Sequence, residues 1–129
     1  MPITYTVDHE GHFIHAVAIY PVTIEEFIEY EVAHATDERV KPPVSELLET
    51  QRSALKEITL DDMRKALKRR EKLEREPEPH RCAIVVSPSD AYGWNLAKFY
   101  EGMVMLHTPE TVIVFGDVRL ARIWLGVKE

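Results

Sequence analysis

The stretch that most constrains the fold is residues 81–106, in which a buried-looking run is followed by a polar turn and an apolar helical pattern. Residues 82–86 carry four aliphatic side chains and one cysteine. A strand that is apolar on both faces is typical of the centre of a parallel sheet. Residues 111–115 repeat this pattern, and Asp117 then predicts the cap of a last helix over residues 118–125. The chain therefore belongs to the α/β class.

The preceding residues supply the other elements. Alternating apolar residues at 3–7 and a second run at 12–20, separated by turn residues, predict a β-hairpin. Thr23 and Glu26 form a capping box that predicts a helix over residues 23–36. Residues 44–49 suit a strand, although a helix over 45–56 is the alternative, and a capped helix is predicted from 59 to about 75.

We predict from this order one domain over residues 1–129 with a β-β-α-β-α-β-α-β-α arrangement. A chain of 129 residues is long enough to bury a sizeable core without disulfides or metals. The lone Cys82 falls in the central strand and is expected to be buried and inert.

Charge and hydropathy limit the function classes. The net charge of −6 argues against a nucleic-acid partner, because phosphate contacts need a basic surface. No apolar run is long enough for a membrane span, and the first residues do not resemble a leader, so we expect a soluble cytoplasmic protein. Residues 59–76 hold seven basic against five acidic residues. Their face is either solvated through i,i+4 ion pairs or a patch for an acidic partner.

The turn after the central strand is the best candidate for a ligand site. Either Ser87 or Ser89 could cap the third helix, with Asp90 in its first turn. Both arrangements leave backbone amides at the carboxyl end of a central strand, where open α/β sheets bind ligands. The candidate ligand-binding residues are Ser87, Ser89, Asp90 and Tyr92. Capping alone is the alternative interpretation.

The third helix is apolar on more than one side. A helical wheel places Tyr92, Leu96, Phe99, Met103 and Leu106 in one stripe, which we expect to face the sheet. The opposite side carries Trp94, Ala97, Val104 and Met105, interrupted by Lys98 and Glu101. The candidate interface residues on it are Trp94, Lys98, Glu101 and Met105. An exposed tryptophan and methionine need cover, either from another helix or from a second copy of the chain. A homodimer is therefore one predicted assembly.

Catalytic, cofactor and metal sites have little support. No nucleotide, zinc or hydrolase signature is present, and we expect no enzyme activity and no cofactor. His12 and His15 lie an odd number of residues apart on a predicted strand, so they point to opposite faces and do not form a metal site with His9. His34, His80 and His107 are expected to be solvated or capping residues. Glu31 lies within the apolar arc of the first helix, where a carboxylate must pair, reach solvent or change its pKa.

Several short motifs resemble bacterial domains related to the sporulation anti-sigma-factor antagonist, the STAS family, whose fold is also compared with lipid-binding CRAL-TRIO domains. The matching motifs are residues 81–89, Ala91-Tyr92-Gly93, Phe99-Tyr100-Glu101, Val114-Phe115-Gly116-Asp117 with Ala121 and Trp124-Leu125, and Ile58-Thr59-Leu60-Asp61-Asp62.

The resemblance implies a mixed five-stranded sheet with helices mainly on one face, and a non-enzymatic regulatory or ligand-binding role. Anti-sigma antagonists carry a phosphorylatable serine in a turn before the second helix. Residues 53–59 lack that motif, but Thr59 occupies the cap position and is the candidate for phosphorylation. A small-molecule or lipid pocket between the sheet and the helices, near Ser87, Ser89 and Tyr92, is the alternative function.

Overall fold

A computed structural model describes residues 2–71 and 80–127. It contains a five-stranded sheet in the order β1-β2-β3-β4-β5, in which β1 is antiparallel to β2 and the remaining neighbours are parallel. The strands are β1 (Ile3–Asp8), β2 (Phe13–Ala18), β3 (Val44–Thr50), β4 (His80–Val85) and β5 (Thr111–Phe115). The helices are α1 (Ile24–Ala35), α2 (Leu60–Glu71), α3 (Ala91–His107) and α4 (Val118–Leu125). The predicted fold class is confirmed.

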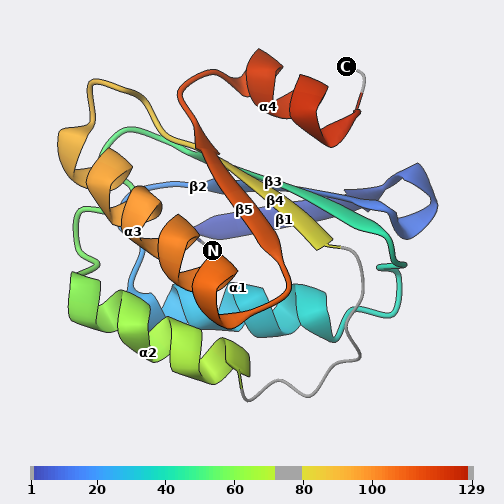
Figure 1. The fold of residues 1–129 in the computed structure, drawn as a ribbon, viewed down its shortest axis with the longest axis horizontal. Coiled ribbons are helices and arrows are strands. Elements are labelled where there is room, and N and C mark those ends of the chain that lie inside the picture. The colour runs from blue at the N-terminus through green and yellow to red at the C-terminus, as the bar shows by residue number, and fades with distance from the viewer. Residues whose placement is uncertain (1, 72–79, 128–129) are drawn as a thin grey trace.

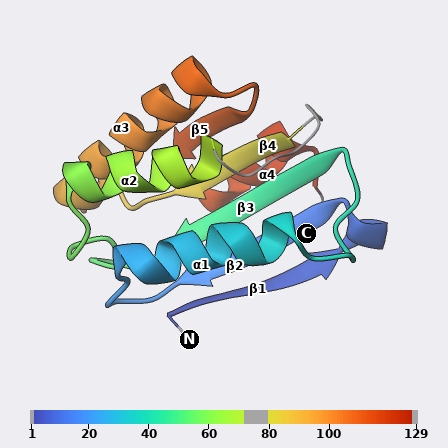
Figure 2. The ribbon, with the colours of Figure 1, turned by 90° about the horizontal axis from the view of Figure 1, so that it is seen from below.

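The helices form two layers of unequal size (Figures 1 and 2). Parallel neighbouring strands joined by right-handed crossovers place α1, α2 and α3 on the same face of the sheet. The short α4 lies on the other face and contacts β3, β4 and β5. In the described part of the chain, the helices therefore lie mainly on one face, as predicted.

Local signals explain where the elements begin. The Thr23 hydroxyl accepts a hydrogen bond from the Glu26 amide, and the Glu26 carboxylate accepts one from the Thr23 amide, so the predicted capping box is present. The same reciprocal pair joins Thr59 and Asp62 before α2. Asp117 caps α4 through the Arg119 amide. These hydrogen bonds confirm the predicted starts of α1, α2 and α4.

The hairpin between β1 and β2 turns through a short 3₁₀ helix, η1 (His9–Gly11). Gly11 has φ of +97°, and a Cβ there would lie 2.2 Å from the Arg39 carbonyl oxygen. A residue with a side chain would be strained here, both by the positive φ and by the clash of its Cβ with the Arg39 carbonyl oxygen. Residues 44–49 lie within β3, which excludes the alternative helix over 45–56.

Two hydrophobic cores hold the layers together. The larger lies between the sheet and α1–α3 and includes Cys82, which is buried as predicted. The smaller lies under α4, where Ala121 and Leu125 pack on Phe13, Leu47 and Ala83. The predicted extension of α2 to about residue 75 and the proline-rich segment after it lie outside the described residues, as do parts of its basic face.

The predicted inner face of α3 is wrong in part. Tyr92 and Leu106 are exposed, whereas Ala97 and Val104, which the wheel placed outside, are buried. The buried residues of the helix are Gly93, Leu96, Ala97, Tyr100, Glu101 and Val104. Large apolar side chains dominate the orientation of a helical wheel. The packed face of α3 also includes the small residues Gly93 and Ala97, which contribute little apolar area and so do not indicate the buried face.

Neither predicted serine caps α3. The Asp90 amide donates to the Ser87 carbonyl oxygen at 2.9 Å, which closes a turn over residues 87–90 and delays the helix to Ala91. Asp90 is the N-cap, and its Oδ1 accepts from the Gly93 amide at 3.0 Å. Ser87 and Ser89 instead hydrogen-bond to each other through their hydroxyls, 2.8 Å apart.

Candidate functional site

The predicted ligand-binding residues lie at the carboxyl ends of the parallel strands. Asp90 and Tyr92 line an open surface hollow of about 450 Å³ together with Ser53 and Lys56 of the connection after β3. Ser87 is exposed nearby but is not among the residues that line the hollow. The structure thus brings two of the four predicted residues together with two that the sequence did not suggest.

The connections at this edge of the molecule are cross-linked by hydrogen bonds. The Ser53 amide donates to Asp90 Oδ2 at 3.2 Å, and the Tyr92 hydroxyl donates to the Ile58 carbonyl oxygen. Tyr20, in the connection after β2, donates to the Glu57 carboxylate at 3.0 Å. The three connections after β2, β3 and β4 are therefore held as one surface.

The same edge exposes large apolar side chains. Ile19 and Tyr20 are each 46% exposed, and Leu60 and Tyr92 are each 48% exposed. We call the hollow and these four residues, Ile19, Tyr20, Leu60 and Tyr92, the carboxyl-edge surface. Hydrogen bonds hold two of these side chains, Tyr20 and Tyr92, in place, and a group of exposed apolar side chains can mark an interaction site.

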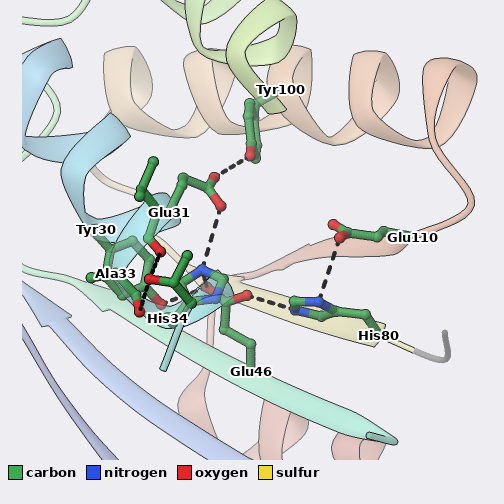
Figure 3. A network of polar contacts seen from close by, with 10 residues as sticks. Tyr30, Glu31, Ala33, His34, Glu46, His80, Tyr100 and Glu110 are labelled. Atoms are coloured by element: carbon green, nitrogen blue, oxygen red, sulfur yellow. Dashed lines mark hydrogen bonds and ion pairs between the residues drawn. The ribbon is translucent and has the colours of Figure 1, made fainter. Parts of the chain in front are cut away.

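A second polar cluster lies inside the molecule, between the sheet and the helices (Figure 3). All of its side chains are 8% exposed or less. Its members, which we call the core polar network, are Tyr30, Glu31 and His34 of α1, Glu46 of β3, His80 of β4, Tyr100 of α3, and Glu110 just before β5.

Glu46 is at the centre of the core polar network. The Tyr30 hydroxyl donates to Glu46 Oε2 at 2.5 Å, and His80 Nε2 lies 2.8 Å from Glu46 Oε1. His34 Nε2 lies 3.6 Å from Glu46 Oε2. One strand carboxylate thereby joins α1 to β4.

The network extends from this centre in two directions (Figure 3). His34 Nε2 lies 3.4 Å from Glu31 Oε2, and Glu31 Oε1 accepts from the Tyr100 hydroxyl at 2.5 Å. On the other side, His80 Nδ1 lies 3.5 Å from Glu110 Oε1. The contacts link α1 with α3, and β4 with the segment that enters β5.

Burial and neighbouring carboxylates perturb this cluster. Burial, and next the charge of Glu46, raise the pKa of the Tyr30 hydroxyl well above its ordinary value, so Tyr30 stays a hydrogen-bond donor at neutral pH. A cavity lined by Glu31, Glu46, Cys82 and Tyr100, among others, measures about 10 Å³. That is close to the space one water molecule needs, so no substrate fits there.

The structure corrects the expectation for two histidines and decides among the three alternatives for Glu31. His34 and His80 are buried members of the network and are neither solvated nor capping. Glu31 pairs inside the protein and does not reach solvent. Because β3 is covered on both faces, Glu46 is buried, and it shares the helix-facing side of the strand with Val44 and Leu48. A carboxylate in that position of a predicted strand was the signal that could have revealed the network.

The other histidines take separate roles. His15 pairs with Glu49 on the face of the sheet opposite α1, and His12 Nδ1 lies 2.8 Å from the Lys41 carbonyl oxygen. His9 contacts the Phe13 ring edge-on. Within residues 2–71 and 80–127, no group of three or more histidine, cysteine or acidic side chains could hold a metal ion.

The predicted interface residues of α3 do not share one exposed face. Lys98 and Met105 are exposed, but Trp94 packs partly against the larger core. Glu101 is buried and accepts a hydrogen bond from the Val114 amide of β5 at 2.7 Å. Only part of the proposed contact face is accessible.

Comparisons of the chain with family models, with curated proteins and with solved structures found no match. Among the described residues, no helix has both the length and the apolar character that crossing a membrane requires.

Proposed function

We propose that this protein is a STAS-like regulatory domain that acts by binding a protein partner through its carboxyl-edge surface, without catalysis. The observation that carries the proposal is that surface itself. Three connections, braced against one another, hold four apolar side chains about half exposed. Two of the four are tyrosines held by hydrogen bonds; tyrosine is typical of interface anchors, and a side chain that is already held loses little conformational entropy when it binds.

The core polar network supports a non-catalytic role. Clusters of carboxylates and imidazoles often mark active sites, but acid–base catalysis needs a substrate within hydrogen-bond reach. The cavity that Glu31, Glu46 and Tyr100 line has room for about one water molecule. The network instead connects α1, β3, β4 and α3, which suits a role in holding the fold.

The strand order agrees with the sheet that the STAS resemblance implies. A mixed sheet with one antiparallel edge strand and helices mainly on one face is present. Thr59, the candidate phosphorylation site, is exposed at the start of α2 beside Leu60 of the carboxyl-edge surface. Phosphate there would meet the helix N-terminus favourably but would also replace a cap that Asp62 completes. Regulation at Thr59 is part of the proposal.

Three further properties belong to the proposal: the kind of small ligand, the surface of a homodimer and the cellular compartment. A lipid-sized pocket between the sheet and the helices receives no support from the small core cavity, although the hollow beside Asp90 and Tyr92 is open to a small polar ligand. A homodimer could use the carboxyl-edge surface in place of the α3 face. A lone, buried cysteine suits a reducing compartment such as the cytoplasm.

Site-specific photocrosslinking in the cells that produce the protein tests the proposal. A photoreactive amino acid at Tyr92 or at Leu60 should give a discrete adduct with a partner protein. The matched control is Ile123 on α4, which is 74% exposed but lies on the other face of the sheet. An adduct of twice the chain mass would identify a homodimer.

Binding of the crosslinked partner to purified protein gives the second readout. Leu60→Glu places an acidic residue at the first position of α2, where it is compatible with the helix dipole, so the variant should fold. It should weaken binding at least about tenfold, the loss expected when a buried apolar anchor becomes charged, whereas Ile123→Glu should not. Equal binding by wild type and Leu60→Glu, or crosslinking at Ile123 alone, would contradict the proposal.

A further inference from the structure

A second surface site lies between α1 and the edge strand β1, away from the carboxyl-edge surface. It is a groove of about 250 Å³ with an apolar wall made of Ile3, Tyr5, Tyr30 and Ala33. Figure 2 shows α1 lying alongside β1, with no strand beyond β1. Within the described residues β1 pairs with β2 alone, so its outer backbone groups are available to another strand.

The walls of the groove are held in place from behind. The Tyr5 and Tyr30 rings contact each other edge to face, with their centroids 5.8 Å apart. The Tyr5 hydroxyl donates to Asp37 Oδ2 at 2.9 Å, and the Tyr30 hydroxyl donates to the buried Glu46. Both rings are therefore fixed before any ligand arrives, which lowers the entropic cost of binding.

The volume indicates what fits. Pockets for drug-sized ligands measure roughly 300–1,000 Å³, and this groove, at about 250 Å³, is smaller. It suits one large apolar side chain, and the open strand edge beside it suits the backbone that carries such a side chain. Together they match the binding mode in which an extended segment adds to a sheet and inserts alternate side chains into pockets.

The charge at the rim selects the kind of segment. Glu26 and Glu29 of α1 line the groove, and Glu29 is exposed. A second copy paired through β1 about a two-fold axis would bring its own Glu26 and Glu29 toward the same rim, and like charges would oppose the pairing. The chain as a whole carries a net charge of −6, which also favours a basic partner.

We infer that the groove receives an extended segment of a partner protein that adds a strand to the outer edge of β1. The segment places an apolar side chain between Tyr5 and Ala33 and basic side chains beside Glu26 and Glu29. Because alternate residues of a strand share a face, the apolar residue and its basic neighbours lie two positions apart.

A synthetic peptide, acetyl-Thr-Lys-Thr-Phe-Thr-Lys-Thr-amide, tests this inference by titration of the ¹⁵N-labelled protein. Its phenylalanine and both lysines share one face of a strand. It should shift the amide resonances of Ile3–Asp8 and of α1, and slow hydrogen exchange in β1. The same peptide with glutamates in place of both lysines should bind at least about fivefold more weakly.

Three variants distinguish binding in the groove from general charge attraction. Glu29→Lys reverses a rim charge and should weaken binding of the lysine peptide at least about fivefold. Glu25→Lys makes the same change at an exposed position of the same helix that does not line the groove, and binding should change less than about twofold. Ala33→Trp should fill the groove and block the shifts.

Three results would overturn the inference. The first is an absence of shifts in β1 at millimolar peptide. The second is equal weakening by Glu29→Lys and Glu25→Lys, which would show charge attraction without a site. The third is sedimentation showing a dimer whose β1 amides are already protected without peptide, since a second copy would then occupy the strand edge.

Discussion

Replacing Glu46 with leucine is the sharpest test of the core polar network. The change preserves side-chain size and the place in β3, but it removes the acceptor of the Tyr30 hydroxyl and the carboxylate beside His80 Nε2. Leaving a buried hydrogen-bonding group without its partner costs about 1–3 kcal/mol. The change takes the Glu46 carboxylate away from both the Tyr30 hydroxyl and His80 Nε2, so we expect a loss of about 4 kcal/mol. Domains of this size are stable by only about 5–15 kcal/mol, so the loss should be large.

Urea unfolding followed by fluorescence of Trp94 and Trp124 measures the effect. With an m-value of about 2 kcal/mol/M, a loss of about 4 kcal/mol lowers the midpoint by about 2 M. The matched control is Glu49→Leu, because Glu49 lies in the same strand and pairs with His15 but is 33% exposed. An exposed pair of that kind contributes at most about 1 kcal/mol.

A Glu46→Leu protein as stable as wild type, or one no less stable than Glu49→Leu, would refute the reasoning. It would mean that apolar packing of the new leucine compensates for the lost pairs, as happens in some buried ion pairs. Tyr100→Phe provides an independent check, since it removes the hydroxyl that donates to Glu31 and should cost about 1.5–3 kcal/mol.

Three further predictions use the same unfolding assay. Gly11→Ala should destabilise by at least about 2 kcal/mol because of its positive φ and its contact with the Arg39 carbonyl, whereas Gly102→Ala, with open space around the new methyl group, should stabilise by about 0.5–1 kcal/mol. Hydrogen bonds from the Arg39 side chain and backbone hold the pKa of Asp37 well below its usual range. The contribution of the Asp37 carboxylate to the free energy of unfolding is therefore complete above the ordinary carboxyl pKa of about 4 and declines as pH falls below it. Asp37→Asn should differ from wild type in stability more at about pH 7 than at about pH 2.5. An equal difference in stability at the two pH values would contradict this. Asp90→Ala should cost about 1–2 kcal/mol, since Asp90 both caps α3 and accepts a hydrogen bond from the Ser53 amide. A cost below about 0.5 kcal/mol would contradict the dual role.

Sequence reasoning succeeded where the signal is local. A capping box involves residues three positions apart, so Thr23 and Thr59 could be recognised as helix starts from the sequence alone. It failed for the α3 cap, because the turn closed by the Ser87 carbonyl and the Asp90 amide competes with an earlier helix start. It also failed for the packed face of α3, which depends on the elements that meet the helix.

What the sequence by itself determined is the class and order of the elements, because hydrophobic periodicity and caps act within a few residues. Only the tertiary structure decided the core polar network and the groove beside β1, and it added Ser53 and Lys56 to the predicted Asp90 and Tyr92 at the carboxyl edge. Tyr100 meets Glu31 across 69 positions and His80 meets Glu46 across 34, and no local pattern encodes such pairs. A histidine or glutamate becomes buried and paired only when separate strands and helices close around it, and the cost of burying it alone makes that pairing obligatory.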